Sequence, residues 1–326
     1  MSIKKHLLKR PVDFLIEKCS PLIAPIVYYM ARTGVGTESC LRRRCLPVPI
    51  HFYQPIPDLE DLEKRNIWNR KSDLEGIVFR SDEQVAFLTE LGKEFGKECD
   101  WPLNPTENPL QFYTANKSFS FGDAASLHCS IRKFKPQHVI EIGSGMSSLV
   151  VHAALSKNNE ESEGEKAKYT IIDPYPGPII ERSLSNSSRL VKQRVECVKK
   201  ELFEQLQKND ILFIDSSHTT KMGSDVNYLI LDVIPSLTCG VVIHFHDISL
   251  PYEYPKVYAT NPRFRVFWTE GYLLQAFLCF NTRFEILLAM NYLMKEHKEV
   301  FCNAFPFYDP QKDLLGTSSF WIRRKQ

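Results

Sequence analysis

The chain has 326 residues, of which 43% are hydrophobic and 25% are charged, and its formal net charge is +2. These values are ordinary for a soluble globular protein, and the length allows one large domain with a sizeable extension. A charge so close to zero predicts no steering toward nucleic acid, so we expect no nucleic-acid partner. The nine cysteines form no C-x-x-C pair. This spacing disfavours structural zinc and a disulfide framework, and it favours reduced thiols in a cytoplasmic protein.

Residues 1–50 are predicted to form an N-terminal arm. A basic start over residues 4–10 precedes an apolar segment, 14–30, which Glu17, Lys18 and two prolines interrupt. The interruptions predict a segment too short and too broken to span a bilayer. No small-residue cleavage site follows it, which argues against a secretory signal. We expect a packed or loosely ordered arm, with peripheral contact to a membrane surface or a partner as the alternative.

Residues 51–122 are predicted to form a helical and extended cap region in front of the main domain. Helical spacing of apolar residues occurs over 58–70 and 82–98, and prolines punctuate the rest. Asp123 is predicted to cap a helix that ends near Phe134. The remaining part, residues 123–326, is expected to be the ligand-binding domain.

From Val139 onward, short apolar strands alternate with helices. The predicted strands cover residues 139–142, 169–172, 194–198, 211–214, 241–245, 284–289 and 319–322. The predicted helices cover residues 147–156, 179–193, 201–207, 224–237 and 272–280, with a shorter one near 292–298. This alternation predicts an α/β fold with a mostly parallel sheet covered on both faces. Ligands of such a sheet bind beyond the carboxyl ends of its strands.

A glycine-rich turn, Gly143-Ser-Gly145, follows the first predicted strand and leads into a helix. Glycines let the backbone turn sharply and let a ligand approach it closely. Asp173 ends the second strand, where a carboxylate can accept hydrogen bonds from the hydroxyls of a ribose. A dinucleotide site would prefer a third glycine where this chain has Ser148. An NAD-dependent oxidoreductase is therefore kept only as an alternative.

Four titratable side chains follow the fourth and fifth predicted strands, namely Asp215, His218, His246 and Asp247. Because these strands are expected to be neighbours, the four side chains should converge beside the bound ligand. The ordinary pKa of histidine suits a general base. His218 is the first choice for this role and His246 the second, with either aspartate orienting the ring. His244 shares the face of the strand with His246 and is predicted to be a core histidine.

The Glu-x-Gly-x-Gly pattern and the order of elements resemble the class I S-adenosylmethionine-dependent methyltransferases, which have a Rossmann-like fold with a seven-stranded, mostly parallel sheet. Residues 140–148, 210–218 and 242–255, with the block at 51–58, resemble more closely a methyltransferase-24-like bacterial group. The resemblance implies S-adenosylmethionine as the cofactor and O-methylation, or N-methylation as a lesser alternative, of a small-molecule or glycan-like acceptor. The implied cofactor-binding residues are Glu141, Gly143, Ser144, Gly145, Ser147, Asp173 and Asp215.

A divalent metal is a further expectation from resemblance. Metal-dependent O-methyltransferases of the catechol type carry an acid after strand four and a ligand pair after strand five. Asp215, His246 and Asp247 match those positions, and a histidine among the ligands shifts the preference toward transition metals. A metal-assisted enzyme with other chemistry and a non-catalytic cofactor-binding protein remain alternatives. The adenine contacts stay unassigned, because Lys199 and Lys200 stand where an acidic or polar residue is usual. The loop over 251–268 is expected to be either a lid or surface packing.

Overall fold

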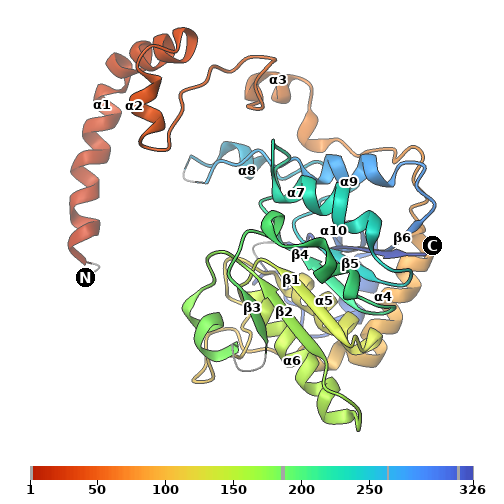
Figure 1. Cartoon of the computed structure of the whole chain (residues 1–326). Helices are drawn as coiled ribbons and strands as arrows, with labels where there is room; N and C mark the ends of the chain where they lie inside the picture. The colour runs from red at the N-terminus through yellow and green to blue at the C-terminus, as the bar shows by residue number, and fades with distance from the viewer. Residues whose placement is uncertain (1–2, 185–187, 263, 314–315, 326) are drawn as a thin grey trace. The chain divides into compact units, whose positions relative to one another are not determined.

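The computed structural model describes residues 3–184, 188–262, 264–313 and 316–325 (Figure 1). It divides into two compact units, Met1–Asn66 and Ile67–Gln326. Residues 67–122, which were expected to belong to a separate cap region, are thus part of the larger unit. Within that unit, helix α4 (Ser81–Phe95) packs against α5 (Phe121–Phe134) and α11 (Lys298–Ala304).

Among its described residues, 3–66, the smaller unit contains three helices, α1 (Ile3–Thr33), α2 (Thr37–Leu41) and α3 (Leu59–Lys64). The prediction of a broken apolar segment is wrong, because α1 is one continuous helix. Each proline removes only one backbone N–H, and the hydrogen bonds on either side carry a long helix past it. The stretch Val12–Thr33 is long and apolar enough to cross a membrane, by length and composition.

The larger unit is built on a seven-stranded sheet of order β3-β2-β1-β4-β5-β7-β6. The strands are β1 (His138–Ile142), β2 (Lys168–Ile172), β3 (Arg189–Val191), β4 (Ile211–Ile214), β5 (Val242–Phe245), β6 (Phe284–Ala289) and β7 (Phe320–Arg324). β7 pairs antiparallel with β5 and β6, and the other pairs are parallel. The predicted seven-stranded, mostly parallel α/β fold is therefore confirmed. The strand order reverses between β1 and β4, and this switch point is where such sheets bind ligands.

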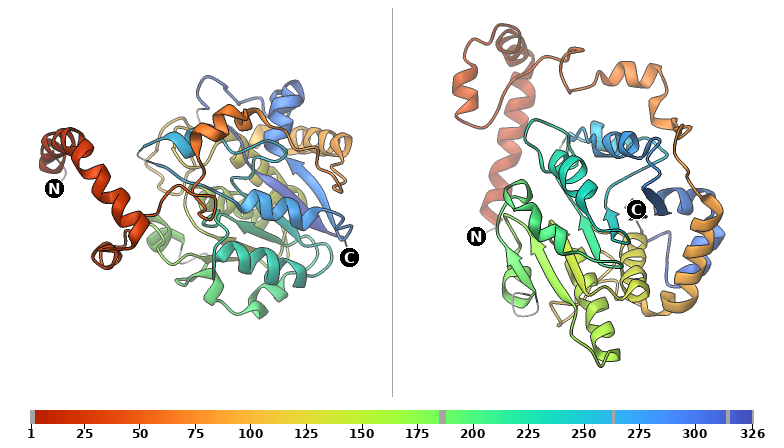
Figure 2. Two further views of the ribbon diagram at one scale, coloured as in Figure 1. Left: turned by 90° about the horizontal axis from the view of Figure 1, so that it is seen from above. Right: turned by 45° about the vertical axis from the view of Figure 1, so that its right-hand side comes forward.

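Helices cover both faces of this sheet, as two views of the ribbon show (Figure 2). The remaining helices are α6 (Met146–Glu161), α7 (Asp225–Asn227), α8 (Lys256–Thr260), α9 (Glu270–Leu278) and α10 (Met290–Glu296). Alternate strand residues point to opposite faces. Val139 and Phe213 therefore lie in one core with α4, α5 and α6, and Ile140 and Ile214 lie in the other with α9.

Three local predictions are wrong. Residues 194–198 form no strand: the third strand is β3, and a short 3-10 turn, Val195–Cys197, follows it. The helix expected over 179–193 is reduced to a single turn, Ile180–Leu184, before β3, and residues 185–187 lie outside the described part. An edge strand of three partly exposed residues has almost no hydrophobic pattern, whereas the apolar run at 194–198 has a stronger one. The strand was therefore predicted at 194–198. The N-cap of α5 is Ser120, whose hydroxyl accepts a hydrogen bond from the Asp123 amide (3.1 Å).

Candidate functional site

The glycine turn after β1 lies against the end of β4. Gly143 has a φ of 83°, and a Cβ there would lie 2.5 Å from the carbonyl oxygen of Asp215. Only glycine fits such a close approach in this conformation. A Cβ on Gly145, in contrast, would meet no atom of the described residues within 4 Å. The first glycine is therefore required by the protein itself, and the second leaves open space at the carboxyl edge of the sheet.

Asp173 lies beside this turn, as the sequence predicted. Its Oδ2 accepts a hydrogen bond from the Ser144 hydroxyl (2.5 Å), and its Oδ1 accepts one from the Tyr175 amide (2.7 Å). Asp173, Ser144 and Gly145 are all partly exposed. A carboxylate that is oriented by these bonds and accessible to solvent can bind the hydroxyls of a ribose.

Glu141 and Ser147 lie behind the turn, in the interior. The fully buried Glu141 carboxylate accepts hydrogen bonds from Ser147 (2.6 Å), Ser148 (2.8 Å) and Tyr169. Burial raises the pKa of Glu141 to about 7, and the three hydroxyl donors only partly oppose this effect. These bonds join β1 and β2 to the start of α6. The predicted contact of Glu141 and Ser147 with a cofactor stays a prediction, and what the structure gives them is a role in holding the turn.

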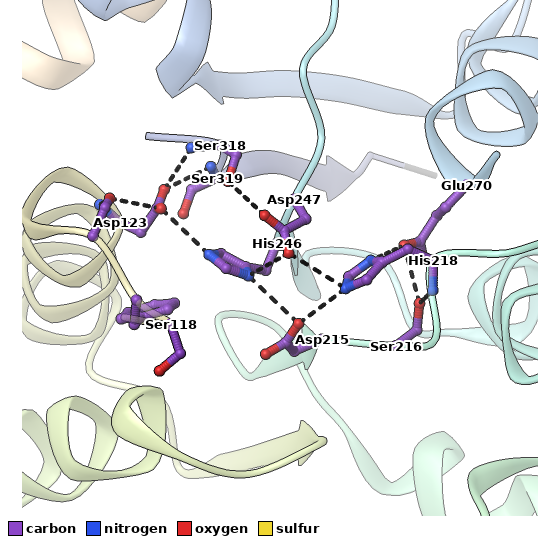
Figure 3. A network of polar contacts seen from close by, with 12 residues as sticks. Ser118, Asp123, Asp215, Ser216, His218, His246, Asp247, Glu270, Ser318 and Ser319 are labelled. Atoms are coloured by element: carbon purple, nitrogen blue, oxygen red, sulfur yellow. Dashed lines mark hydrogen bonds and ion pairs between the residues drawn. The ribbon is translucent and has the colours of Figure 1, made fainter. Parts of the chain in front are cut away.

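The four acid and histidine side chains predicted at the ends of β4 and β5 converge (Figure 3). Nε2 of His218 lies 3.2 Å from Oδ1 of Asp215 and 3.5 Å from Oδ2 of Asp247. Nδ1 of His246 lies 3.4 Å from the same Asp215 oxygen and 3.5 Å from the same Asp247 oxygen. His218 and Asp247 both have a positive φ, 55° and 58°. Non-glycine residues in this strained conformation are concentrated at functional sites.

His246 points one ring nitrogen into the protein and the other into the cluster. Its Nε2 lies 3.3 Å from Oδ2 of Asp123, at the first turn of α5. Its buried Nδ1 has no hydrogen-bond partner among the described residues. Ligand atoms of Asp215, His246 and Asp247 all lie within 4.8 Å of one another. A histidine fixed by a carboxylate at one nitrogen, with the other facing two carboxylates, matches the surroundings of a metal-ligating histidine.

Asp123 is the functional residue that sequence reasoning assigned to a helix cap. Its Oδ1 accepts hydrogen bonds from the Thr317 hydroxyl (2.6 Å) and from the amides of Ser318 and Ser319 (both 2.8 Å). Burial opposes ionisation, but the bonds to His246, Thr317 and Ser120 hold the pKa of Asp123 far below its ordinary value. The contact joins α5 to β5 across 123 positions of the chain, and no local pattern indicated it.

Glu270 is the second residue whose role only the structure shows. It lies at the start of α9 and is fully buried behind His218. Its Oε2 lies 2.8 Å from Nδ1 of His218 and accepts a hydrogen bond from the Ser216 hydroxyl (3.0 Å). The Trp268 ring lies 4.5 Å from the imidazole, centroid to centroid. His218 is thus fixed between Glu270 on one side and the two aspartates on the other.

The charges of this cluster shift the pKa values of its members. Burial alone would lower the pKa of His218, but the bonds to Asp215 and Glu270 and the charge of Asp247 raise it to about 10. The pKa of His246 is likewise raised, because the Asp247 and Asp215 charges outweigh its burial. The pKa of Asp215 is held far below its ordinary value by both histidines. In the free protein the cluster is therefore a set of charges that stabilise one another.

Two smaller expectations also have outcomes. His244 is a core histidine, stacked between Phe213 and Trp321 with ring centroids 4.4 and 3.9 Å away. The residues that follow the third strand are Lys192 and Gln193, so Lys199 and Lys200 do not occupy the strand end where adenine contacts are expected.

The loop after β5 is held at its start. The Tyr252 hydroxyl donates to Glu296 (2.5 Å), and the backbone at Lys71 forms a bridge with Tyr252. Further along, the Tyr254 hydroxyl accepts a hydrogen bond from the Gly271 amide (2.8 Å). Arg263 of this loop lies outside the described residues. The first residues of the loop are therefore packed against their surroundings, and the role of the loop as a lid stays a prediction.

Comparisons with known proteins give the family. A methyltransferase-24 family model, described as a methyltransferase domain, matches residues 140–248. An uncharacterized protein of Archaeoglobus fulgidus is 31% identical over 170 residues, which are 50% of this chain and 75% of that protein.

Similar solved structures include the methyltransferase PaMTH1 of Podospora anserina with bound SAH (14% identity, TM-score 0.38, 86% of this chain and 100% of that chain). Another is cmcI-N160 with SAH (14% identity, TM-score 0.37, 63% of this chain and 77% of that chain). At these TM-scores the likeness adds nothing to the site described above. The family match covers the glycine turn, Asp173 and the whole acid–histidine cluster of β4 and β5. Residues 140–248 of the chain are thus a methyltransferase domain of the methyltransferase-24 family.

Proposed function

We propose that this protein transfers a methyl group from S-adenosylmethionine to a hydroxyl group of a small-molecule or glycan-like acceptor, with His218 as the general base. One observation carries the proposal: the open glycine turn and the Asp/His cluster meet at one edge of the sheet. Gly143 approaches the backbone of Asp215 so closely that no side chain fits between them. A ligand bound at the glycine turn would thus lie next to the Asp/His cluster that handles the proton.

Gly143, Ser144, Gly145 and Asp173 are the residues that would hold the cofactor. The glycines bring a bare backbone to the ligand, and Asp173 offers a carboxylate oriented by Ser144. The sulfonium centre of the cofactor supplies an electrophilic methyl group. The protein must then supply an acceptor position in line with that group and a base for the acceptor proton.

His218 offers Nε2 as the atom that takes the proton, because Nδ1 is occupied by Glu270. Glu270 and Asp215 stabilise the imidazolium that results, which is the product of proton transfer. The pKa of about 10 applies while Asp215 and Asp247 carry their full negative charge. Neutralising part of that charge lowers the pKa of His218 toward its ordinary value and frees Nε2.

Asp215, His246 and Asp247 fit a divalent cation. The fit rests on the buried Nδ1 of His246, which has no hydrogen-bond partner in the described chain and faces both carboxylates. Asp123 fixes the ring from the opposite side. A mixed nitrogen and oxygen donor set of this kind suits Mn²⁺ or a related transition metal more than Mg²⁺. The bound ion would supply positive charge beside the acceptor oxygen.

We also propose that the enzyme works in the cytoplasm. All nine cysteines are free thiols, and Cys45, Cys197 and Cys239 are exposed. Exposed thiols persist in a reducing compartment.

The first experiment measures S-adenosylhomocysteine and NADH binding to the full chain by calorimetry, and transfer of a labelled methyl group to a panel of phenols and monosaccharides. We expect binding of S-adenosylhomocysteine only, and methyl ethers as products by mass spectrometry. His218→Asn should lower kcat by about 100-fold or more and leave S-adenosylhomocysteine affinity unchanged. His152→Asn, a half-buried histidine of α6 outside the site, is the matched control. Full activity of His218→Asn would remove the base assignment, and exclusively N-methylated products would remove the hydroxyl acceptor.

A separate titration tests the metal. Mn²⁺ binding, measured by electron paramagnetic resonance, should disappear in Asp247→Asn and weaken by about 10- to 100-fold in Asp123→Asn. Equal Mn²⁺ binding in all three proteins, or undiminished turnover after chelation, contradicts this part of the proposal.

A further inference from the structure

Helix α1 of the smaller unit exposes an unusual amount of apolar surface. The side chains of Phe14, Leu15, Leu22 and Ile26 are all more than half exposed. None of the described side chains from residue 12 to residue 66 is buried, so this unit has no core of its own to cover the helix. A helix that is apolar around its whole circumference is normally buried in a protein core or in a membrane. Something outside this unit must therefore cover α1.

The dimensions of the helix fit a lipid bilayer. The apolar stretch Val12–Thr33 has 22 residues. At about 1.5 Å per residue it is about 33 Å long, close to the hydrocarbon thickness of about 30 Å. Residues 19–31 contain no charged side chain; the charges of the stretch are Asp13, Glu17 and Lys18 toward its start and Arg32 at its end. Lysine can extend its ammonium group to the interface from such a position.

The residues at the two ends of the helix suit a membrane interface. Lysines and an arginine occupy four positions within residues 4–10, and an arginine cluster at 42–44 follows α2. Tyr28 and Tyr29, both exposed, lie near the C-terminal end of the apolar stretch. Basic residues attract anionic headgroups, and tyrosines favour the boundary between headgroups and hydrocarbon. These two basic clusters flank the apolar stretch along the chain, whereas the net charge of the whole chain is only +2.

We propose that α1 anchors the protein in a lipid bilayer, with Val12–Thr33 across the hydrocarbon region, its uncharged residues 19–31 deepest, and the basic clusters against anionic headgroups. The anchor is distinct from the methyltransferase site and does not depend on the acceptor. The free energy gained when the exposed apolar side chains leave water holds the helix in lipid. The basic residues add an electrostatic attraction that salt weakens.

The test is flotation of the full chain with vesicles of 70% phosphatidylcholine and 30% phosphatidylglycerol. The protein should float in 0.1 M NaCl and stay bound in 0.5 M NaCl, because apolar insertion is not screened by salt. The double variant Leu22→Glu/Ile26→Glu places two charges at exposed positions of α1 (77% and 61% exposed). It should lose at least 90% of the floated fraction.

The matched control is Val78→Glu/Leu231→Glu, which adds the same charges at exposed positions of the larger unit (76% and 54% exposed). It should float like the unchanged protein. Thermal unfolding of both variants verifies that the larger unit is intact. Failure to float at 0.1 M NaCl, release by 0.5 M NaCl, or equal loss in the control would overturn the anchor. So would an intact mass showing that protein extracted from cell membranes has lost the helix, because α1 would then be a removable leader.

Discussion

Glu141→Gln gives a pH-dependent test of the buried carboxyl behind the glycine turn. The pKa of Glu141 rises from an ordinary 4.5 to about 7, chiefly because the group is buried. A folded-state pKa above the unfolded value means that the folded protein binds this proton more tightly. The stabilisation is therefore complete below pH 4.5 and is lost as the pH rises through 7.

The difference between these pKa values, at about 1.4 kcal/mol per pH unit, amounts to about 3 kcal/mol in the free energy of unfolding. Glutamine cannot ionise, so its variant lacks this term at every pH. The free energy of unfolding of the unchanged protein, minus that of Glu141→Gln, should fall by about 3 kcal/mol between pH 4.5 and pH 8. Other titrating groups contribute to both proteins and largely cancel in the difference.

Urea unfolding followed by tryptophan fluorescence measures this difference, since all four tryptophans lie in the larger unit. The control is Glu163→Gln, an exposed glutamate in the loop after α6, whose curve should run parallel to that of the unchanged protein. A difference for Glu141→Gln that is constant across this pH range would refute the reasoning. It would show that the hydroxyl donors fully compensate for burial.

Three further predictions concern the turn, the base and a distant ion cluster. Gly145→Ala should be as stable as the unchanged protein, because its Cβ meets open space, but should bind S-adenosylhomocysteine about 10-fold or more weakly, whereas Gly143→Ala should lose about 2 kcal/mol of stability. Calorimetry measures the affinity and urea unfolding the stability. An unchanged affinity in Gly145→Ala contradicts the assignment of this glycine to the cofactor site. Glu270→Gln should lower kcat by about 10- to 100-fold and leave the KM for the cofactor unchanged, because it removes the negative charge behind His218 but keeps the hydrogen bond to Nδ1 of His218. An unaltered kcat would show that Glu270 has a purely structural role. For Glu98, burial opposes ionisation, but the bonds to His128 and Arg132 lower its pKa to about 2, so its stabilisation is present above pH 4.5 and is lost as the pH falls toward 2. Glu98→Gln should therefore lower the free energy of unfolding by about 2 kcal/mol at pH 7 and by less at pH 3, as urea unfolding would measure. A larger loss at pH 3 than at pH 7 would contradict this reasoning.

Local sequence patterns predicted most of the strands and their carboxyl ends. An apolar run such as 211–214, followed directly by Asp215, marks both the buried strand and the point where the chain leaves the core. The same reasoning failed at β3, because a three-residue edge strand buries too little surface to require an apolar pattern. It also failed at α1, where prolines were given more weight than the length of the helix around them.

The sequence by itself determined that Gly143, Asp173, Asp215 and His246 share one edge of a parallel sheet, because strand alternation and strand ends are encoded by neighbouring residues. Only the tertiary structure decided which groups face them. Asp123 reaches His246, and Glu270 reaches His218, through helices that pack onto the sheet from distant parts of the chain. Such contacts depend on how whole elements pack, and no spacing along the chain records them.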